Sequence, residues 1–259
     1  MVIFQVNQLK FSYDETPVLK GISFDLDHGS ILGVVGPNGS GKTTLIKCLN
    51  GLVKPDGGDL EFEGRDLANF SRREIARTIG YVPQAENQTF PYTVFDAVLT
   101  GRSARNRWKP SEGDLTAVAR TLAEMGLDEL ALRDVRELSG GQLRKVLIAR
   151  AFAQDPRVLS LDEPMASLDL CHQLEVLNTV QNWLTDDRAA LITFHDLNLA
   201  AKYCDELLIM KEGEIFARGG PEVLTPETIE PVYGVEVEVN ENHSTRWIEP
   251  KRPLTGNRG

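Results

Sequence analysis

A glycine-rich octapeptide between an apolar run and a helix-forming segment limits the possible folds of this chain. Residues 36–43, Gly-Pro-Asn-Gly-Ser-Gly-Lys-Thr, match every fixed position of the pattern G-x-x-x-x-G-K-[ST]. Residues 31–35 form an apolar run before it, and residues 44–49 after it are compatible with a helix. Glycines let backbone N–H groups converge on phosphate oxygens, and a helix N-terminus adds positive potential. The pattern predicts a strand, a phosphate-binding loop and a helix.

Within this loop, Lys42 is expected to reach the β- and γ-phosphates of a nucleotide, and the Thr43 hydroxyl is expected to coordinate Mg²⁺. A glycine-rich turn that matches by chance is the weaker interpretation, because the flanking strand and helix are both indicated. The predicted nucleotide-binding residues here are Gly36, Pro37, Asn38, Gly39, Ser40, Gly41, Lys42, Thr43 and Thr44.

An acidic pair follows a second apolar run, residues 158–161. A strand there would deliver Asp162 to the edge of a sheet as a second Mg²⁺ ligand, and Glu163 could deprotonate the attacking water. Alone, such a pair is more often the start of a helix. The phosphate loop upstream favours the catalytic interpretation.

Alternating polar and apolar residues at 22–27 predict a half-buried strand, and a strand is also expected at 189–194. Helical patterns dominate residues 85–155, so we expect an α/β fold with a mainly parallel sheet. We expect one domain over residues 1–259, with a helical subdomain at about 85–155 and a C-terminal extension at about 226–259. Two helices are expected to bury apolar faces, the first, capped by Ser111, through Leu115, Val118, Ala119 and Leu122, and the second through Leu174, Leu177, Val180 and Leu184.

The composition of the chain limits which kinds of partner and compartment we expect for it. The formal net charge is −10, from 28 Lys and Arg against 38 Asp and Glu, which gives no support for nucleic-acid binding. The three cysteines are far apart, as expected in a reducing cytoplasm. No secretory signal and no run of 18 apolar residues is visible, so the chain is not expected to cross a membrane by itself.

The segment Leu-Ser-Gly-Gly-Gln at residues 138–142 resembles the signature of ABC-type ATPases. Further positions resemble that family in the same order: Tyr13 where an aromatic ring stacks on adenine, Gln84 where the family has its loop glutamine, residues 167–169 where it has the D-loop, and His195 where it has the switch histidine. The similarity covers roughly residues 2–225.

The resemblance implies a phosphate-loop ATPase fold with an N-terminal antiparallel β subdomain and a helical insertion. It implies that Gln84 and His195 act with Glu163 in catalysis, that Gln84 also contacts Mg²⁺, and that Tyr13 and Asp169 contact nucleotide. It further implies a head-to-tail homodimer in which each chain presents a second anion site to the ATP of the other, made of Ser139, Gly140, Gly141 and Gln142. A self-contained kinase or GTPase is the competing possibility.

Two stretches depart from the family pattern. Met165-Ala166 stands where threonine is common after Glu-Pro, and Leu143-Arg144-Lys145 stands where Arg-Gln-Arg is common. Neither replaces a phosphate or metal ligand, so we expect them to affect details of the dimer interface rather than the reaction.

Residues 93–102 resemble a segment of the importers of iron–siderophores, haem and cobalamin. The resemblance implies an ATP-binding subunit on the cytoplasmic face of the membrane, with a multi-span permease contacting residues around 85–110, including Phe95 and Arg102, and with an extracytoplasmic substrate-binding protein. Import of molybdate, zinc or manganese is the alternative, and a soluble non-transport ABC ATPase is less favoured. At the C-terminus, Val235, Val237 and Val239 predict a half-buried strand, although a regulatory role for His243 or the neighbouring acids stays open.

Overall fold

The computed structural model describes residues 1–84, 93–105, 109–166, 168–242 and 245–254. The chain divides into two compact units, one formed by residues 1–69 and 191–259 and the other by residues 70–190. The expected single domain with a helical part at about 85–155 stays a prediction, and His243 lies outside the described residues. Within the described residues, no helix is both long and apolar enough to span a lipid bilayer.

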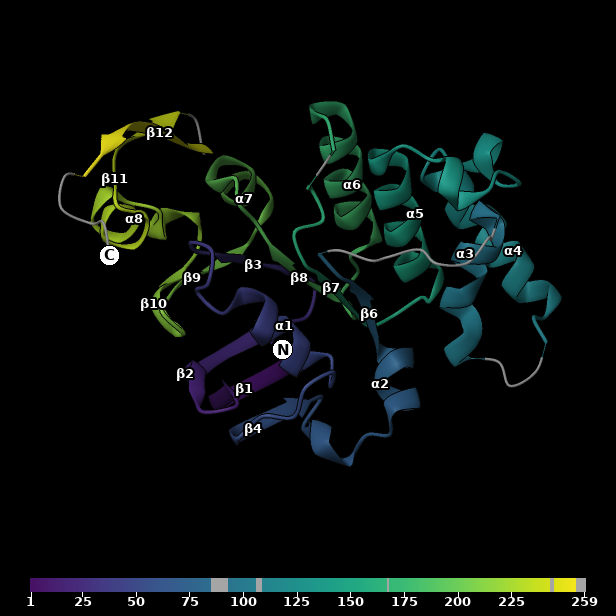
Figure 1. Ribbon diagram of the computed structural model, residues 1–259, viewed down its shortest axis with the longest axis horizontal. Coiled ribbons are helices and arrows are strands. Elements are labelled where there is room, and N and C mark those ends of the chain that lie inside the picture. Colours follow the sequence, from purple (N-terminus) through teal and green to yellow (C-terminus); the bar gives the residue numbers. More distant parts are fainter. Residues whose placement is uncertain (85–92, 106–108, 167, 243–244, 255–259) are drawn as a thin grey trace. The chain divides into compact units, whose positions relative to one another are not determined.

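The first unit begins with an antiparallel sheet in the order β2-β1-β4-β5 (Figure 1). Along β2 the side chains of Ile22, Phe24 and Leu26 are buried and alternate with more exposed positions, as the period-two pattern predicts. The strands are β1 (Val2–Tyr13), β2 (Thr16–Asp27), β4 (Gly57–Phe62) and β5 (Arg65–Asp66), and the short helix η1 (Leu67–Asn69) follows.

Parallel pairing supports the rest of this unit. Strand β3 (Ile31–Val35) is buried at every position and pairs in parallel with β9 (Glu206–Lys211), which pairs antiparallel with β10 (Glu214–Gly219). Strand β8 (Ala189–Thr193) crosses the boundary between the units. The helices are α1 (Lys42–Leu49), α7 (Leu197–Tyr203), η5 (Pro221–Val223) and α8 (Pro226–Tyr233).

The C-terminal extension forms a two-stranded antiparallel hairpin of β11 (Val235–Asn242) and β12 (Thr245–Pro253), which confirms the expected strand. The hairpin is fastened to α7 by the Asn198 side chain. Its Nδ2 donates to the Ile248 carbonyl at 3.2 Å, and the Ile248 N–H donates to Asn198 Oδ1 at 2.7 Å.

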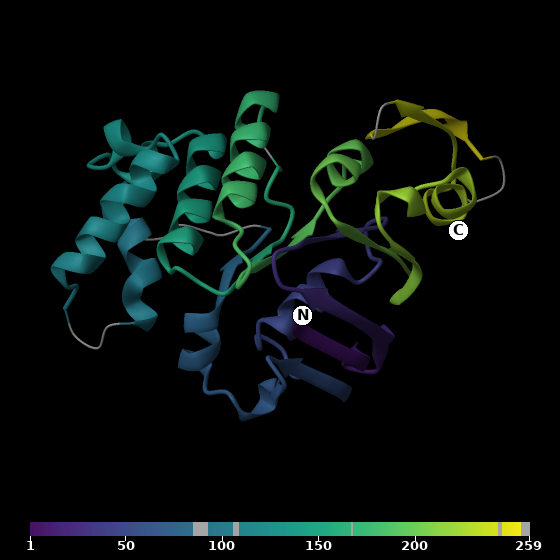
Figure 2. The ribbon, with the colours of Figure 1, turned by 180° about the vertical axis from the view of Figure 1, so that it is seen from behind.

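The second unit contains most of the helices and one parallel strand pair, β6 (Ile79–Val82) with β7 (Val158–Leu161). Helices α3, α4 and α5 contact one another, and both ribbon views show them side by side (Figures 1 and 2). The helices are α2 (Arg72–Thr78), α3 (Val94–Leu99), η2 (Thr100–Ala104), α4 (Glu112–Glu124), η3 (Asp128–Leu130), η4 (Val135–Glu137), α5 (Gly140–Ala153) and α6 (Leu170–Trp183). An α/β fold with parallel strand pairing, an antiparallel N-terminal part and a helical part is confirmed.

Two expected helix faces are wrong in detail. On α4 the predicted cap Ser111 and the buried Val118 are confirmed, but Leu115 is 41% exposed, Ala119 is exposed, and the buried side instead includes Asp114 and Thr121. On α6, Leu177 and Val180 are buried as expected, whereas Leu174 is 39% exposed and Val176 replaces it. Apolar spacing identified both helices but misplaced part of each buried face. On α4 the reason is that polar side chains with internal partners can also be buried.

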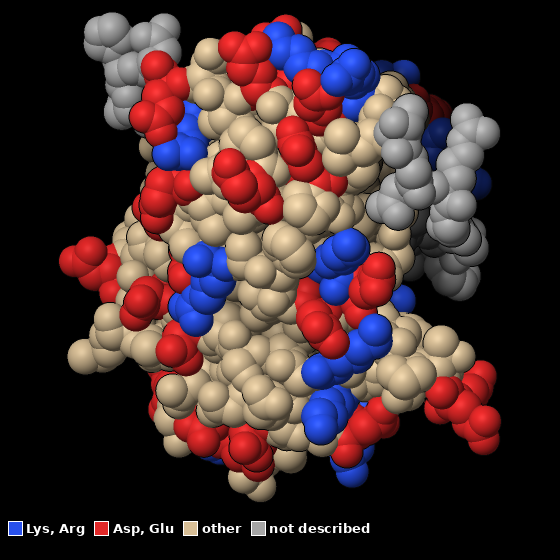
Figure 3. All heavy atoms as spheres, turned by 90° about the vertical axis from the view of Figure 1, so that its left-hand side faces the viewer, with Lys and Arg blue, Asp and Glu red and all other residues tan. Residues whose placement is uncertain are grey.

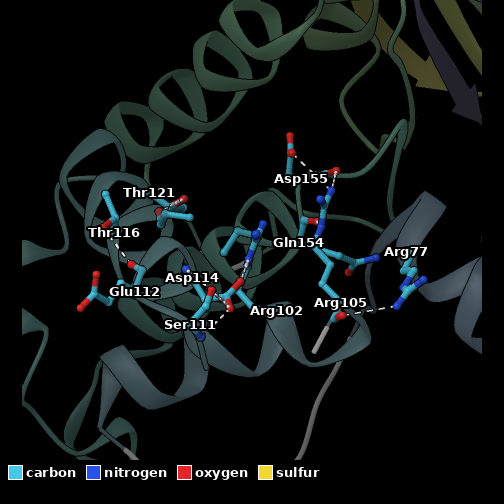
Figure 4. A network of polar contacts seen from close by, with 12 residues as sticks. Arg77, Arg102, Arg105, Ser111, Glu112, Asp114, Thr116, Thr121, Gln154 and Asp155 are labelled. Atoms are coloured by element: carbon cyan, nitrogen blue, oxygen red, sulfur yellow. Dashed lines mark hydrogen bonds and ion pairs between the residues drawn. The ribbon is translucent and has the colours of Figure 1, made fainter. Parts of the chain in front are cut away.

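One such polar group is Asp114 (Figure 4). Its Oδ1 accepts from Arg102 Nε at 2.8 Å, and its Oδ2 accepts from the Ser111 backbone N–H at 2.9 Å and the Ser111 hydroxyl at 2.6 Å. These hydrogen bonds, those from Ser111 first, hold the Asp114 pKa well below its ordinary value. Arg102 also donates to the Ala153 carbonyl at 2.9 Å and is only 15% exposed. The Arg102 guanidinium is thus engaged inside the helical unit, and contact of this residue with a permease stays a prediction.

We expect Asp114→Asn to lower the free energy of unfolding at pH 7 by about 1–3 kcal/mol, the typical contribution of hydrogen bonds to charged groups. Because the folded-state pKa lies below the unfolded value of about 3.9, the stabilisation is complete above that value and disappears as pH falls through the folded-state pKa. Urea unfolding at pH 7 and at about pH 3, followed by circular dichroism, tests this. Glu124→Gln on the same helix removes only an exposed ion pair with Arg120 and is the control. A loss in Asp114→Asn that is equally large at both pH values would contradict the prediction.

Candidate nucleotide site

The predicted phosphate loop connects β3 to α1 in the first unit, and its glycines are sterically required. Gly36 has φ +151°, and a Cβ on it would lie 2.3 Å from the Met210 carbonyl oxygen. Gly41 has φ +101° and precedes the first residue of α1. Side chains at these positions would be strained and would fill the loop, so the observed backbone explains why the pattern needs glycine there.

Lys42 is the first residue of α1, and the structure places its ammonium group against its own loop. The Nζ atom donates to the Gly36 carbonyl at 2.7 Å and to the Pro37 carbonyl at 3.0 Å. The Ser40 hydroxyl nearby is buried and has no hydrogen-bond partner within the described part of the chain. A lysine that can change partners and an unsatisfied buried hydroxyl are the chemistry expected of a phosphate cradle. The helix starts at Lys42, two residues before the expected position.

Two other predicted residues of the first unit are exposed. Tyr13 ends β1 at 45% exposure, and its ring meets Phe11 edge to face with centroids 4.8 Å apart. His195 lies between β8 and α7, directly before Asp196, whose carboxylate caps α7. Contact with a nucleotide stays a prediction for both residues.

The second unit brings Gln84 and Glu163 together, although they are 79 residues apart in the sequence. Gln84 follows β6 and Glu163 follows β7, so the parallel pairing of these strands places both at the same edge. Gln84 Nε2 donates to Glu163 Oε2 at 2.6 Å. Between β7 and Glu163 lies Asp162, which is fully buried and donates its backbone N–H to the Val82 carbonyl at 2.9 Å.

Glu163 has a strained backbone. Its φ of +47° lies in the left-handed region, which residues with a Cβ adopt rarely. Such conformations persist only where neighbouring groups hold them, and they cluster at functional sites. The acidic pair after β7 is therefore more than a helix start: Glu163 is buried, strained and hydrogen-bonded to the predicted loop glutamine.

The signature segment caps a helix. Ser139 is the N-cap of α5: its hydroxyl accepts from the Gln142 N–H at 3.2 Å, and the Gln142 side chain accepts from the Ser139 N–H at 3.0 Å. The helix begins at Gly140, and Gly140 and Gly141 form its first turn. A Cβ on Gly140 would meet only open space, so this helix end is accessible.

Asp169 caps α6 in the same way. Its Oδ1 accepts from the His172 backbone N–H at 2.9 Å, and this bond above all holds the Asp169 pKa below its usual value. Ser167, which precedes it in the expected D-loop, lies outside the described residues.

The expected magnesium ligands are a hydroxyl on Thr43, a carboxylate on Asp162 and an amide on Gln84. Hydroxyl, carboxylate and amide oxygens suit Mg²⁺, which typically takes one or two carboxylates and completes its shell with phosphates and water. The described residues contain no group of three His, Cys, Asp or Glu side chains that could hold a metal unaided. Binding of Mg²⁺ by these three residues stays a prediction.

Sequence reasoning missed the part that Arg144 takes in this arrangement. It is buried in its own chain, where its guanidinium donates to backbone carbonyls of the Gln84 and Glu163 segments. The only hint in the sequence was that Arg144 departs from the family pattern. The neighbouring residues did not indicate which carbonyls it would contact.

Comparison with known proteins agrees with these features. The ABC transporter family profile matches residues 19–166. An uncharacterised ABC transporter ATP-binding protein of Methanocaldococcus jannaschii is 41% identical over 91% of this chain and 93% of its own length. The hemin import ATP-binding protein HmuV of Rhizobium meliloti is 38% identical over 90% of this chain and 93% of its own. The cobalamin import ATP-binding protein BtuD of Halobacterium salinarum is 40% identical over 89% of this chain, which spans only 58% of that relative.

Among solved structures, a chain of an inward-facing transporter assigned to the metal-chelate type of ABC transporter superimposes with a TM-score of 0.83. It is 29% identical, and the similarity covers 98% of this chain and 99% of that one. The phosphate loop, the acidic pair and the signature thus occur in a chain whose sequence and fold agree with one family throughout. The chain belongs to the ABC transporter family, as one of its ATP-binding chains, and is an ATPase.

Proposed function

We propose that this chain is the ATP-binding subunit of an importer for metal chelates such as iron–siderophores, haem or cobalamin. The observation that carries the catalytic part is the Gln84–Glu163 hydrogen bond at the ends of β6 and β7. The substrate class rests on relatives named for hemin and cobalamin import and on the structural relative of metal-chelate type. Molybdate, zinc or manganese import is the alternative.

In this proposal the phosphate loop binds ATP through its backbone N–H groups, and Tyr13 stacks on the adenine. Lys42 exchanges the Gly36 and Pro37 carbonyls for the β- and γ-phosphates, whose charged oxygens form stronger hydrogen bonds with an ammonium group. Thr43 and Asp162 would hold Mg²⁺, which neutralises phosphate charge.

Glu163 is the general base that accepts a proton from the attacking water, and Gln84 positions its carboxylate. His195 assists near the γ-phosphate. A second copy supplies the start of its α5, from Ser139 to Gln142, together with Asp169. Closure of the dimer on ATP would move a permease between its two states, a coupling of distant sites through one bistable assembly.

A soluble ABC enzyme that acts on nucleic acid is the functional alternative. The net charge of −10 opposes it, and Figure 3 shows acidic side chains interspersed among the basic ones on the face that it displays. On the C-terminal hairpin these charges form ion pairs, including Arg252 with Glu236 and Lys251 with Glu238. The acidic side chains on this face would repel a phosphate backbone.

We expect Glu163→Gln to bind ATP normally and to turn over ~10²–10⁴ times more slowly, because the side chain keeps its shape but cannot accept the proton. Nucleotide binding by equilibrium titration and phosphate release by purified protein measure the two quantities. Glu129→Gln, at an exposed acidic residue of η3, is the control and should match the wild type. Turnover of Glu163→Gln near the wild-type rate would refute the assigned role.

The shared site predicts recovery of activity in mixtures. Lys42→Ala and Ser139→Arg chains should each be inactive alone. A mixed dimer should have one site with both lesions and one intact site, so hydrolysis should return on mixing. Phosphate release is measured against the mixing ratio, with dimer formation followed by light scattering. A kinase-like enzyme would instead need a phosphate acceptor, and mixed dimers without activity would argue against the shared site.

Coupling to a membrane protein is tested by expressing the chain with the proteins encoded beside it. We expect co-purification in detergent with a multi-span protein, and ATPase stimulation by a binding protein loaded with haem, cobalamin or ferric siderophore. Phe95→Glu, on a half-buried residue of α3, should uncouple this stimulation and leave ATP binding intact, whereas Glu129→Gln should do neither. Stimulation by molybdate, zinc or manganese would change the substrate class, and stimulation by nucleic acid would overturn the transporter proposal.

A further inference from the structure

Arg144 lies in the second turn of α5, five residues after the signature serine, and is only 6% exposed. Its guanidinium donates to backbone carbonyls of the two loops that carry Gln84 and Glu163. Nε donates to Pro164 at 3.2 Å, Nη1 donates to Pro83 and to Gln84 (3.3 Å), and Nη2 donates to Asp162 (2.7 Å) and Glu163 (2.8 Å). One side chain thus joins the signature helix to both loops.

The contacts of Nη2 surround the strained residue. The Asp162 and Glu163 carbonyls belong to the peptide groups on either side of the Glu163 Cα, and both accept from this one nitrogen. Fixing these two peptides fixes the φ and ψ angles between them. Arg144 therefore holds Glu163 in the left-handed conformation that its φ of +47° records.

The same side chain closes a ring of contacts through the glutamine loop. Arg144 Nη1 holds the Gln84 carbonyl, the Gln84 side chain donates to the Glu163 carboxylate, and the Glu163 carbonyl accepts from Arg144 Nη2. Moving either loop away from α5 breaks this ring. The position of the Glu163 carboxylate thus depends on Arg144, which acts on the Glu163 backbone.

Arginine suits these carbonyl acceptors better than glutamine or lysine does. Its planar guanidinium has five N–H donors and no acceptor, whereas glutamine has two donors and an oxygen that would face carbonyls, and lysine has three donors around one point. Burial lowers the Arg144 pKa, and the charges of Asp162 and Glu163 oppose this effect.

We propose that Arg144 is a positioning residue that locks the Gln84 and Glu163 loops to the signature helix and so sets the geometry of the general base. The proposal rests on the catalytic role proposed for Glu163. It also explains one departure from the family pattern. Where this family commonly has glutamine, this chain has Arg144, whose guanidinium donates to both loops at once.

The test compares Arg144→Gln and Arg144→Lys with Lys145→Gln. Lys145 is the neighbouring buried cation on α5, but it pairs with Glu175 of α6 at 3.0 Å instead of with the loops. We expect both Arg144 variants to lose kcat by ~10- to 10²-fold, because a misplacement of about 1 Å of a reacting group costs that much. KM for ATP should stay within about twofold, since the phosphate loop is untouched, and Lys145→Gln should keep both constants.

Amide hydrogen exchange provides a readout that does not depend on activity. The backbone amides of Gln84, Asp162, Glu163, Met165 and Ala166 should exchange faster in both Arg144 variants than in the wild type and Lys145→Gln, at equal global stability checked by urea unfolding. Wild-type kcat in Arg144→Lys would overturn the proposal, because charge alone would then suffice. So would unchanged exchange in Arg144→Gln.

The Glu163→Gln variant separates this failure from that of the proposed function. If Glu163→Gln is inactive while Arg144→Gln has wild-type kcat and exchange, only the positioning proposal is overturned. If Glu163→Gln hydrolyses ATP normally, Glu163 is not the general base. Arg144 then cannot position a general base through Glu163, whatever the exchange rates of the loops.

Discussion

Backbone pairing between β6 and β7 is the interaction on which the catalytic half of the candidate site depends. The two strands are short, parallel and buried at most positions, and the Asp162 N–H extends their pairing by one more bond to Val82. Because parallel strands end at the same edge, residues that follow them must meet there. Gln84 and Glu163 come together for this reason, and their hydrogen bond is a consequence of strand register.

A site at such an edge needs support, because the backbone leaves the sheet there and its carbonyls lose their ladder partners. In this chain a buried guanidinium replaces those partners. Arg144 satisfies carbonyls of both loops and stabilises the unfavourable conformation of Glu163. The cost of burying a cation is offset by charge-assisted hydrogen bonds and by the nearby carboxylates.

The phosphate loop of the first unit solves a different problem, which is to keep a cation near an anion site before the anion arrives. Lys42 donates to the Gly36 and Pro37 carbonyls, whose oxygens are neutral. Phosphate oxygens carry charge and form stronger hydrogen bonds with an ammonium group. Binding can therefore replace loop contacts by nucleotide contacts while the strand and helix on either side stay in place.

Short-range patterns in the sequence are enough to predict the local elements: the loop at 36–43, the strand before the acidic pair and the capped helix after Ser111. The sequence motifs also indicate the family. It identified Glu163 and Gln84 as site residues, although the catalytic roles of both stay predictions. The strained backbone of Glu163 and the partners of Arg144 become visible only in the folded chain. The partners of Arg144 lie between 18 and 61 residues away from it in the sequence. Periodicity reports which residues share a face, and motifs report which chemistry is present. Neither reports which distant carbonyls a buried side chain will meet, because packing between elements decides that.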